Sequence, residues 1–154
     1  MVGTAYLLDV NVLLALLWPR QEHHSIVRAW FLRRGRHHWA TCPITEAGCV
    51  RLLSNPSATP GALRVSEALQ VLGRNLKQPG HVFWPDDVDL LTAIEPSCDR
   101  IQGSRQITDA YLLGLATRHE AHLATLDGGI AALTPLSPGN TTRVINLLEE
   151  TRTP

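Results

Sequence analysis

Short apolar runs alternate along this chain with longer stretches whose apolar residues repeat at helical spacing. The short runs are typical of buried strands, and the longer stretches are typical of helices that cover them. Because two parallel strands need a crossover connection, usually a helix, this alternation predicts βαβ units and a mostly parallel sheet. We therefore expect a single α/β domain with three layers, α/β/α, around one central sheet.

The expected strands are the apolar runs Thr4–Leu8, Trp39–Cys42, Val82–Trp84, His122–Thr125 and Arg143–Leu147. The expected helices are Asn11–Leu17, His23–Arg33, Pro43–Ser54, Val65–Leu76, Asp86–Ile94 and Ser104–Glu120. We expect Asp86 or Asp87 to cap the fifth helix and Ser104 to cap the sixth, because short oxygen side chains accept hydrogen bonds from a helix's first N–H groups. Glu95–Gly103 is expected to be a loop.

A length of 154 residues favours one domain, which we expect to span residues 1–150 and to end in a frayed tail at Thr151–Pro154. No apolar run approaches the ~20 residues of a membrane span. The N-terminus lacks the basic region and cleavage site of a signal peptide. The three cysteines form no CxxC pair, which predicts neither a structural disulfide nor a zinc site and favours a cytoplasmic location.

The chain has no net charge, whereas a nucleic-acid enzyme usually carries a basic footprint. Its distribution of charge is more informative, because thirteen of the fourteen basic residues are Arg, whose planar guanidinium suits phosphate. One local basic cluster contains Arg33, Arg34, Arg36, His37 and His38. This cluster is either a phosphate-binding surface or a solvated helix end.

Four acidic residues, Asp9, Glu46, Asp109 and Asp127, follow expected strands or lie in the first turns of expected helices. In an open α/β sheet these positions meet in one crevice. Crowded carboxylates repel one another unless a cation holds them, and hard oxygen ligands select Mg²⁺ or Mn²⁺. We expect Asp9 and Asp109 to bind the principal ion and Glu46 to complete the site. Asp127 would orient a water molecule or support a second ion.

Each acid also has a simpler structural interpretation. Asp9 suits the N-cap of the first helix, unless Asn11 serves as the cap and leaves Asp9 free for metal. Glu46 is favoured in a first turn by the helix dipole, and Asp127 before two glycines suits a turn. Asp109 is the most informative, because its helical neighbours are apolar and a buried carboxylate is costly unless paired or bound to metal. Four such placements at one sheet edge are more specific than any one of them.

Four motifs span nearly the whole chain in this order: Leu7–Leu14, then Thr45–Glu46 with Arg51–Pro56, then Thr108–Leu112, then Ala124–Asp127. In order and spacing they resemble the PIN-domain ribonucleases, and within them the VapC-type toxins of toxin–antitoxin pairs. The resemblance implies that Asp9, Glu46, Asp109 and Asp127 form the catalytic acidic quartet. It also gives supporting positions to Asn11 and Arg51. The hydroxyl of Thr125 either positions a water molecule or phosphate, or satisfies backbone groups.

The resemblance further implies a Mg²⁺- or Mn²⁺-dependent endoribonuclease on a three-layer α/β/α fold. The implied partners are an RNA substrate, a protein antitoxin that occludes the site and a second copy in a homodimer. Three alternatives remain open: a catalytically silent adaptor with the same fold, a DNA-cutting relative and a haloacid-dehalogenase-like phosphatase. The phosphatase would need a second Asp two residues after the first, where Asn11 stands.

Overall fold

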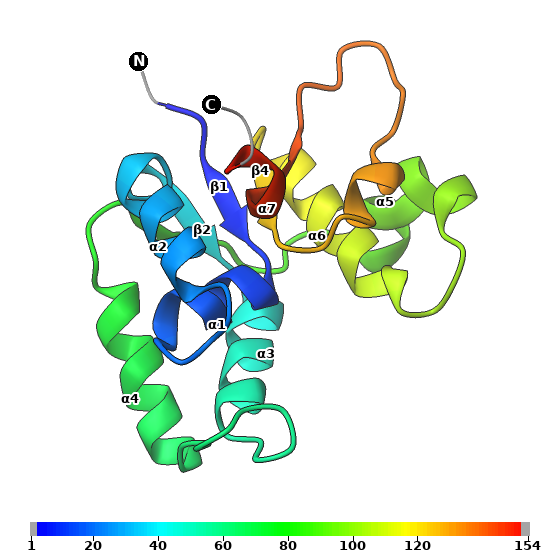
Figure 1. Ribbon diagram of the computed structural model, residues 1–154. Coiled ribbons are helices and arrows are strands. Elements are labelled where there is room, and N and C mark those ends of the chain that lie inside the picture. Colours follow the sequence, from blue (N-terminus) through cyan, green and yellow to red (C-terminus); the bar gives the residue numbers. More distant parts are fainter. Residues whose placement is uncertain (1–2, 152–154) are drawn as a thin grey trace.

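Five parallel strands form the central sheet of the computed structural model, which describes residues 3–151 (Figure 1). The strands are β1 Tyr6–Leu8, β2 Trp39–Thr41, β3 His81–Phe83, β4 His122–Thr125 and β5 Val144–Asn146. Their order is β3-β2-β1-β4-β5, and every neighbouring pair is parallel. The predicted α/β class is confirmed. Four strands fall inside their predicted ranges, and β3 begins one residue early.

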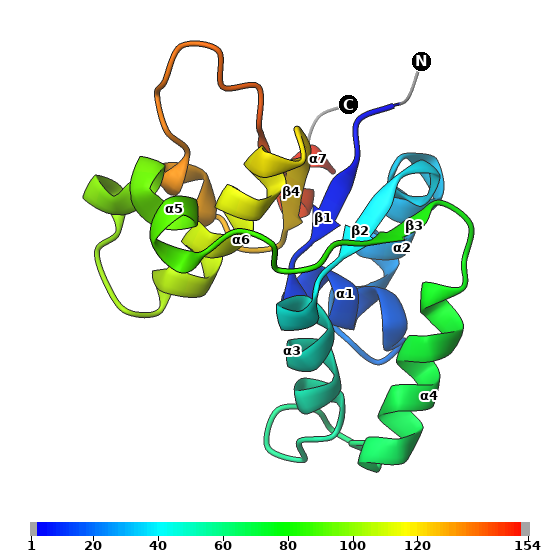
Figure 2. The same ribbon diagram turned by 180° about the vertical axis from the view of Figure 1, so that it is seen from behind.

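Helices cover both faces of this sheet, as the two opposite views show (Figure 1, Figure 2). One side carries α1 Val10–Leu17, α2 His24–Arg33, α3 Pro43–Leu53 and α4 Val65–Leu76. The other side carries α5 Leu90–Ile94 and α6 Gln106–Arg118, and α7 Leu147–Glu150 follows β5. Short 3₁₀ helices occupy Gly35–His37, Glu95–Arg100 and Ile130–Leu133. The expected three layers are therefore present.

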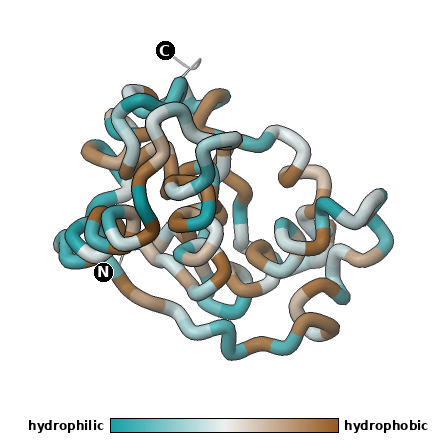
Figure 3. Tube along the Cα trace, turned by 90° about the horizontal axis from the view of Figure 1, so that it is seen from below, coloured by the Kyte–Doolittle hydropathy of each residue, from teal (hydrophilic) through white to brown (hydrophobic). Residues whose placement is uncertain are grey.

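The sheet divides the apolar core in two. Successive strand residues point to opposite faces, so Leu7 and Leu123 pack with α6, whereas Leu8 and Ala124 pack with the helices of the other side. Strands buried on both faces need apolar residues at every position, which explains the unbroken apolar runs. Along the helices the residues change between hydrophobic and hydrophilic over short distances, as Figure 3 shows.

The predicted cap of α5 was wrong. Asp89 caps this helix, because its side chain accepts a hydrogen bond of 2.9 Å from the backbone N–H of Thr92. Asp86 and Asp87 lie before the helix, in the segment that follows β3. The carboxylate of Asp87 instead pairs with Arg118 at 3.1 Å. Asp87, which the local pattern predicted as a cap, thus makes a tertiary contact instead.

The start of α6 was also predicted wrongly. The helix begins at Gln106, and no side chain caps it. Ser104 lies in the preceding turn, where its carbonyl accepts a hydrogen bond of 3.3 Å from the N–H of Ile107. The expected loop before α6 is in part a 3₁₀ helix, Glu95–Arg100, with Pro96 in its first turn. Proline favours such a turn because its ring fixes φ.

The structure describes only the first residue of the expected C-terminal tail. Of the expected tail, Thr151 lies in a turn and residues 152–154 fall outside the described residues. Within residues 3–151, no helix is both long and apolar enough to cross a membrane. The cysteines Cys42 and Cys49 are buried and Cys98 is exposed, and all three are free thiols.

Candidate active site

The strands β1 and β4 lie side by side at the point where the strand order of the sheet reverses. Leu8 of β1 pairs with Ala124 of β4, and the backbone N–H of Asp9 donates to the carbonyl of Ala124 at 3.0 Å. Asp9 therefore stands directly opposite Thr125. Ligands of open α/β sheets bind outside the carboxyl ends of the strands at such a switch point. The predicted position of the acidic site corresponds to this edge.

Asp9 is the N-cap of α1 and is only 6% exposed. Its Oδ1 accepts a hydrogen bond of 2.7 Å from the N–H of Val10, and its Oδ2 accepts one of 2.8 Å from the hydroxyl of Thr125. The alternative in which Asn11 caps the helix is therefore wrong. Burial raises the pKa of Asp9, and the charge of Asp127 adds to this, while the hydrogen bonds oppose it.

Asn11 and Thr125 join α1 to the end of β4. The amide of Asn11 accepts a hydrogen bond of 3.1 Å from the N–H of Leu126 and lies 3.5 Å from the hydroxyl of Thr125. The hydroxyl of Thr125 also accepts a bond of 3.0 Å from the N–H of Asp127. Thr125 thus satisfies a backbone group, as one of its two interpretations required, and in addition orients the carboxylate of Asp9.

Asp109 and Asp127 share the electrostatic environment of Asp9. Asp109 lies in the first turn of α6 and is half-buried. Burial, together with the charges of Asp9 and Asp127, raises its pKa to about 6. Asp127 is exposed and accepts a hydrogen bond of 2.8 Å from the N–H of Gly129, so it also has the predicted role in a turn. Within residues 3–151 none of the three aspartates forms an ion pair.

Glu46 belongs to a neighbouring network. Its Oε1 accepts a hydrogen bond of 2.6 Å from the hydroxyl of Thr41, which lies 2.8 Å from Nε2 of His81. The charges that raise the pKa of Asp109 do not include Glu46. The structure therefore gathers three of the four acids into one electrostatic site and holds the fourth beside two residues that the sequence did not single out. Among residues 3–151, no group of three or more His, Cys, Asp or Glu side chains is arranged to hold a metal ion as it stands.

Helix α3, which carries Glu46 in its first turn, packs against α1. The two helices approach closely at Gly48, where an added Cβ would lie 2.8 Å from Cγ2 of Val10. Val10 follows Asp9 directly, and Gly48 lies two residues after Glu46. A side chain at Gly48 would push the helices apart.

Thr41 and His81 differ in how far the sequence could have indicated them. Thr41 is the last residue of β2, as Thr125 is the last of β4, so a hydroxyl at a strand end was a readable signal. His81 reaches Thr41 only because β3 pairs with β2 in a register that places His81 opposite Trp39. The apolar pattern of two short strands does not specify this register.

A family model described as the PIN domain matches residues 6–134 of the chain. Ribonuclease VapC38 of Mycobacterium tuberculosis (strain ATCC 25618 / H37Rv) is 41% identical over 142 residues, which cover 92% of this chain and 99% of that protein. The chain belongs to the PIN-domain family of VapC ribonucleases. A second VapC relative from the same strain, ribonuclease VapC39, is 42% identical over 125 residues, covering 81% of this chain and 90% of its own.

Solved PIN-domain structures share the fold at lower sequence identity. Mycobacterium tuberculosis VapC20, a sarcin-ricin loop cleaving toxin, superposes with a TM-score of 0.65 at 14% identity, covering 85% of this chain and 96% of that chain. FitAcB from Neisseria gonorrhoeae superposes with a TM-score of 0.61 at 20% identity, covering 93% and 98%. The expected resemblance to VapC toxins is confirmed.

The basic side chains of this VapC relative lie at different distances from the carboxyl ends of the strands. Arg51 is exposed in the last turn of α3 and forms no ion pair within residues 3–151. The basic cluster at residues 33–38 lies between α2 and β2, before the first residue of β2. It therefore sits at the opposite edge of the sheet from Asp9. Of these groups, only Arg51 belongs to a helix that starts at the acidic edge.

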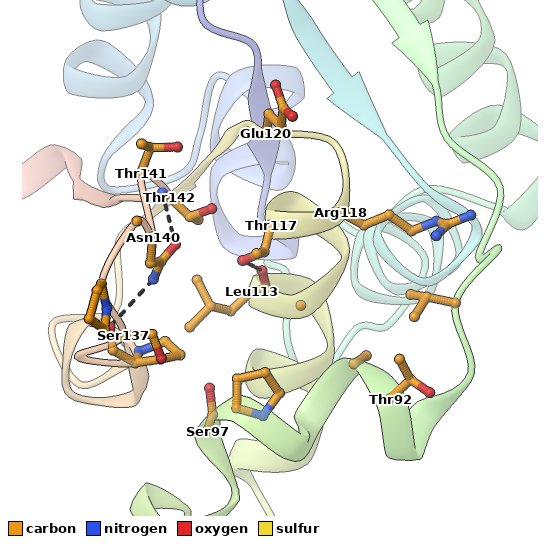
Figure 4. A pocket seen from close by; sticks show the side chains of 17 residues that line it. Thr92, Ser97, Leu113, Thr117, Arg118, Glu120, Ser137, Asn140, Thr141 and Thr142 are labelled. Atoms are coloured by element: carbon orange, nitrogen blue, oxygen red, sulfur yellow. Dashed lines mark hydrogen bonds between the residues drawn. The ribbon is translucent and has the colours of Figure 1, made fainter.

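A large cavity of this PIN domain lies away from the acids. It encloses about 840 Å³ between α5, the second half of α6 and the loop at residues 134–142 (Figure 4). Two of its hydroxyls bond within the chain, since Ser97 donates to the carbonyl of Leu133 and Thr117 to that of Leu113, both at 2.8 Å. None of the four acids lines it. Its size therefore does not make it the catalytic site.

Proposed function

We propose that this protein is a metal-dependent endoribonuclease and the toxin of a toxin–antitoxin pair, hydrolysing RNA phosphodiesters at the acidic edge of the sheet. The observation that carries the proposal is the gathering of three aspartates from three separate segments, where burial and then the charges of Asp9 and Asp127 raise the pKa of Asp109 to about 6. Perturbed carboxylates gathered in one place are typical of functional sites. Further support comes from VapC38, which is named a ribonuclease. The match covers 92% of this chain and 99% of VapC38.

The three aspartates fit a divalent cation by the chemistry of their donors. They supply hard carboxylate oxygens, the ligands that Mg²⁺ and Mn²⁺ prefer. Like charges held together without a basic partner favour either a proton or a cation, and the charges of Asp9 and Asp127 add to burial in raising the pKa of Asp109. We propose that Asp9 and Asp109 bind the principal ion. Glu46 completes the site, and Asp127 orients a water molecule or supports a second ion. A bound ion supplies Lewis-acid chemistry, which lowers the pKa of water and stabilises charge on phosphoryl oxygens.

The residues around Asp9 hold its carboxylate in place before any ligand arrives. Val10 and Thr125 each donate to one of its two oxygens, and Asn11 fastens α1 to the backbone that follows Thr125. A preorganised carboxylate avoids the cost of ordering it during the reaction. Arg51 is proposed to contact the phosphate backbone of the RNA, because its guanidinium is exposed on the helix that starts at the acidic edge and forms no ion pair within residues 3–151.

The proposed partners of the protein are RNA, a protein antitoxin that covers the acidic edge and a second copy of the chain. Solved structures that share the fold include VapBC2 from Rickettsia felis bound to a DNA fragment from its promoter. Its name supports a paired antitoxin for this chain. The three free thiols fit a reducing compartment, and we propose the cytoplasm as the site of action.

Cleavage of total cellular RNA by the purified, antitoxin-free protein tests the proposed activity. Discrete fragments are expected with Mg²⁺ or Mn²⁺, and none with EDTA or with the variants Asp9→Asn and Asp109→Asn. Asp99→Asn is the matched control, because it removes the same charge from an exposed residue of the 3₁₀ helix before α6. Fragments that persist in both site variants, or no fragments from a folded wild type with either ion, would contradict the proposal and favour a catalytically silent adaptor.

A further inference from the structure

A chain of hydrogen bonds fixes the carboxylate of Glu46 to the two strands farthest from β4 and β5. The hydroxyl of Thr41 in β2 lies 2.6 Å from Oε1 of Glu46, and Nε2 of His81 in β3 lies 2.8 Å from the same hydroxyl. A hydrogen bond of 2.6 Å between a hydroxyl and a carboxylate is in the short range that marks charge-assisted bonds. The contact is therefore a strong restraint on the side chain.

The hydrogen bonds between His81, Thr41 and Glu46 can run in only one direction. An ionised carboxylate only accepts hydrogen bonds, so Thr41 must give its single hydroxyl proton to Glu46. The lone pairs of the Thr41 oxygen then remain to accept a proton, which His81 supplies from Nε2. The imidazole is thereby restricted to a state with a proton on Nε2. The hydroxyl of Thr41 thus has one defined partner on each side.

The scaffold behind these two residues is rigid. Thr41 is fully buried at the end of β2. His81 stands opposite Trp39 in the pairing of β3 with β2, and the two rings lie 4.6 Å apart between centroids. Trp39 is only 1% exposed and its indole N–H donates to the carbonyl of Pro79 at 3.3 Å. The position of His81 is thus fixed by the core.

The consequence for Glu46 is that its two oxygens are no longer equivalent. Oε1 is taken by Thr41, whereas Oε2 forms no hydrogen bond with any residue in the range 3–151. We propose that Thr41 and His81 are positioning residues that make Glu46 present Oε2 alone to the divalent ion. This inference rests on the proposed function, in which Glu46 completes the metal site. Groups that orient metal ligands in this way typically change metal affinity or activity by about 10–100-fold when they are lost.

The test measures Mn²⁺ affinity by electron paramagnetic resonance on the RNA-free protein, alongside the rate of RNA cleavage. Thr41→Val removes the hydroxyl but keeps the branched shape, and Thr41→Ser keeps the hydroxyl. His81→Phe keeps a ring against Trp39 but removes the donor, and His81→Gln keeps a donor. The Val and Phe variants are expected to bind Mn²⁺ at least about tenfold more weakly, and the Ser and Gln variants within about threefold of wild type. Thermal unfolding of all four variants checks that the fold is retained.

A double-mutant cycle with Glu46→Gln separates this inference from the proposed function. If Thr41 acts through Glu46, Thr41→Val causes no further loss of Mn²⁺ affinity in the Glu46→Gln background. Equal losses in both backgrounds, or unchanged affinity in folded Thr41→Val and His81→Phe, would overturn the inference. If Asp9→Asn abolishes Mn²⁺ binding while Glu46→Gln leaves it unchanged, the positioning role fails and the proposed function stands. If Asp9→Asn also leaves binding unchanged, both fail.

Discussion

The hydroxyl of Thr125 donates a 2.8 Å hydrogen bond to Oδ2 of Asp9, although 116 residues separate them in the sequence. The bond joins the carboxyl ends of β4 and β1 on one face of the sheet. It means that the most buried acid of the candidate site takes its orientation from a residue in the last third of the chain. The geometry of the site and the stability of the fold therefore depend on the same contact.

Thr125→Val is expected to impair both properties. The variant leaves a buried carboxylate oxygen and the N–H of Asp127 without their partner, which costs about 1–3 kcal/mol of unfolding free energy. Cleavage should fall about tenfold or more, because Asp9 loses one of its two restraints. Urea unfolding and initial cleavage rates measure the two effects. Thr125→Ser should recover most of both, and a Val variant as active as wild type would refute the orienting role.

Asp109→Asn is expected to stabilise the metal-free protein near neutral pH. The folded state raises the pKa of Asp109 from 3.8 to about 6, so its ionised form opposes folding. Between these two values the folded state binds more protons than the unfolded state, and the free energy of unfolding falls as pH rises. After discounting for solvent screening of a half-buried group, the gain in Asp109→Asn is about 1–2 kcal/mol above pH 6.

The same variant should show no gain at acid pH. Below pH ~3 the carboxyl of Asp109 is protonated in both states, so wild type and variant should converge. Urea unfolding in EDTA from pH ~3 to pH ~7.5 follows the difference directly. A constant difference across this range, or a less stable variant at pH 7.5, would mean that the ionised carboxylate of Asp109 does not destabilise the folded protein.

Two arginines, one on the helix that starts at the acidic edge and one at the opposite edge, should affect RNA binding differently. Arg51→Ala should weaken binding and lower the slope of log affinity against log salt by about one, as loss of one phosphate contact requires. Arg33→Ala, at the edge opposite Asp9, should leave both within about twofold of wild type. Fluorescence anisotropy with RNA, using the inactive Asp9→Asn protein as the common background, measures both. Equal losses would place the RNA across both edges of the sheet.

Substitutions of two helical glycines, Gly114 and Gly73, test how tightly the helices pack. A Cβ at Gly114 of α6 would lie 2.3 Å from the carbonyl oxygen of Ala93, so Gly114→Ala must separate α5 from α6. We expect a loss of about 1–3 kcal/mol. Gly73 of α4 has no atom within 4 Å of the added Cβ, so Gly73→Ala should gain up to about 1 kcal/mol from helix propensity. Thermal melts compare them, and a stable Gly114→Ala would show that the two helices can shift freely.

The elements of the fold were predictable because burial leaves a pattern along the chain. Leu7 and Leu8 pack on opposite faces of the sheet, so the first strand had to be apolar throughout. Helix ends were less predictable, because a cap is chosen by contacts from elsewhere. Asp87 could have capped α5, but Arg118 from the following helix pairs with it, and Asp89 takes that role.

The candidate site, like the fold, was predictable in part. Asp9, Asp109 and Asp127 lie together because strand ends and helix starts share one edge of a parallel sheet. Their part in catalysis remains a prediction. The surroundings of Glu46 could not be predicted, because the contact between Thr41 and His81 depends on the register of two three-residue strands. Register is a tertiary property that such short segments do not encode.

The pairing of β1 with β4 also decides when the acidic edge can exist during synthesis. β1 leaves the ribosome well before β4 and Asp127, because 116 residues separate Asp9 from Thr125 along the chain. Until then Asp9 lacks Thr125, its neighbouring strand and the charge that it shares with Asp127. A nascent chain therefore has no assembled acidic centre. A cell producing this protein meets that centre only once β4 has been made and has paired with β1.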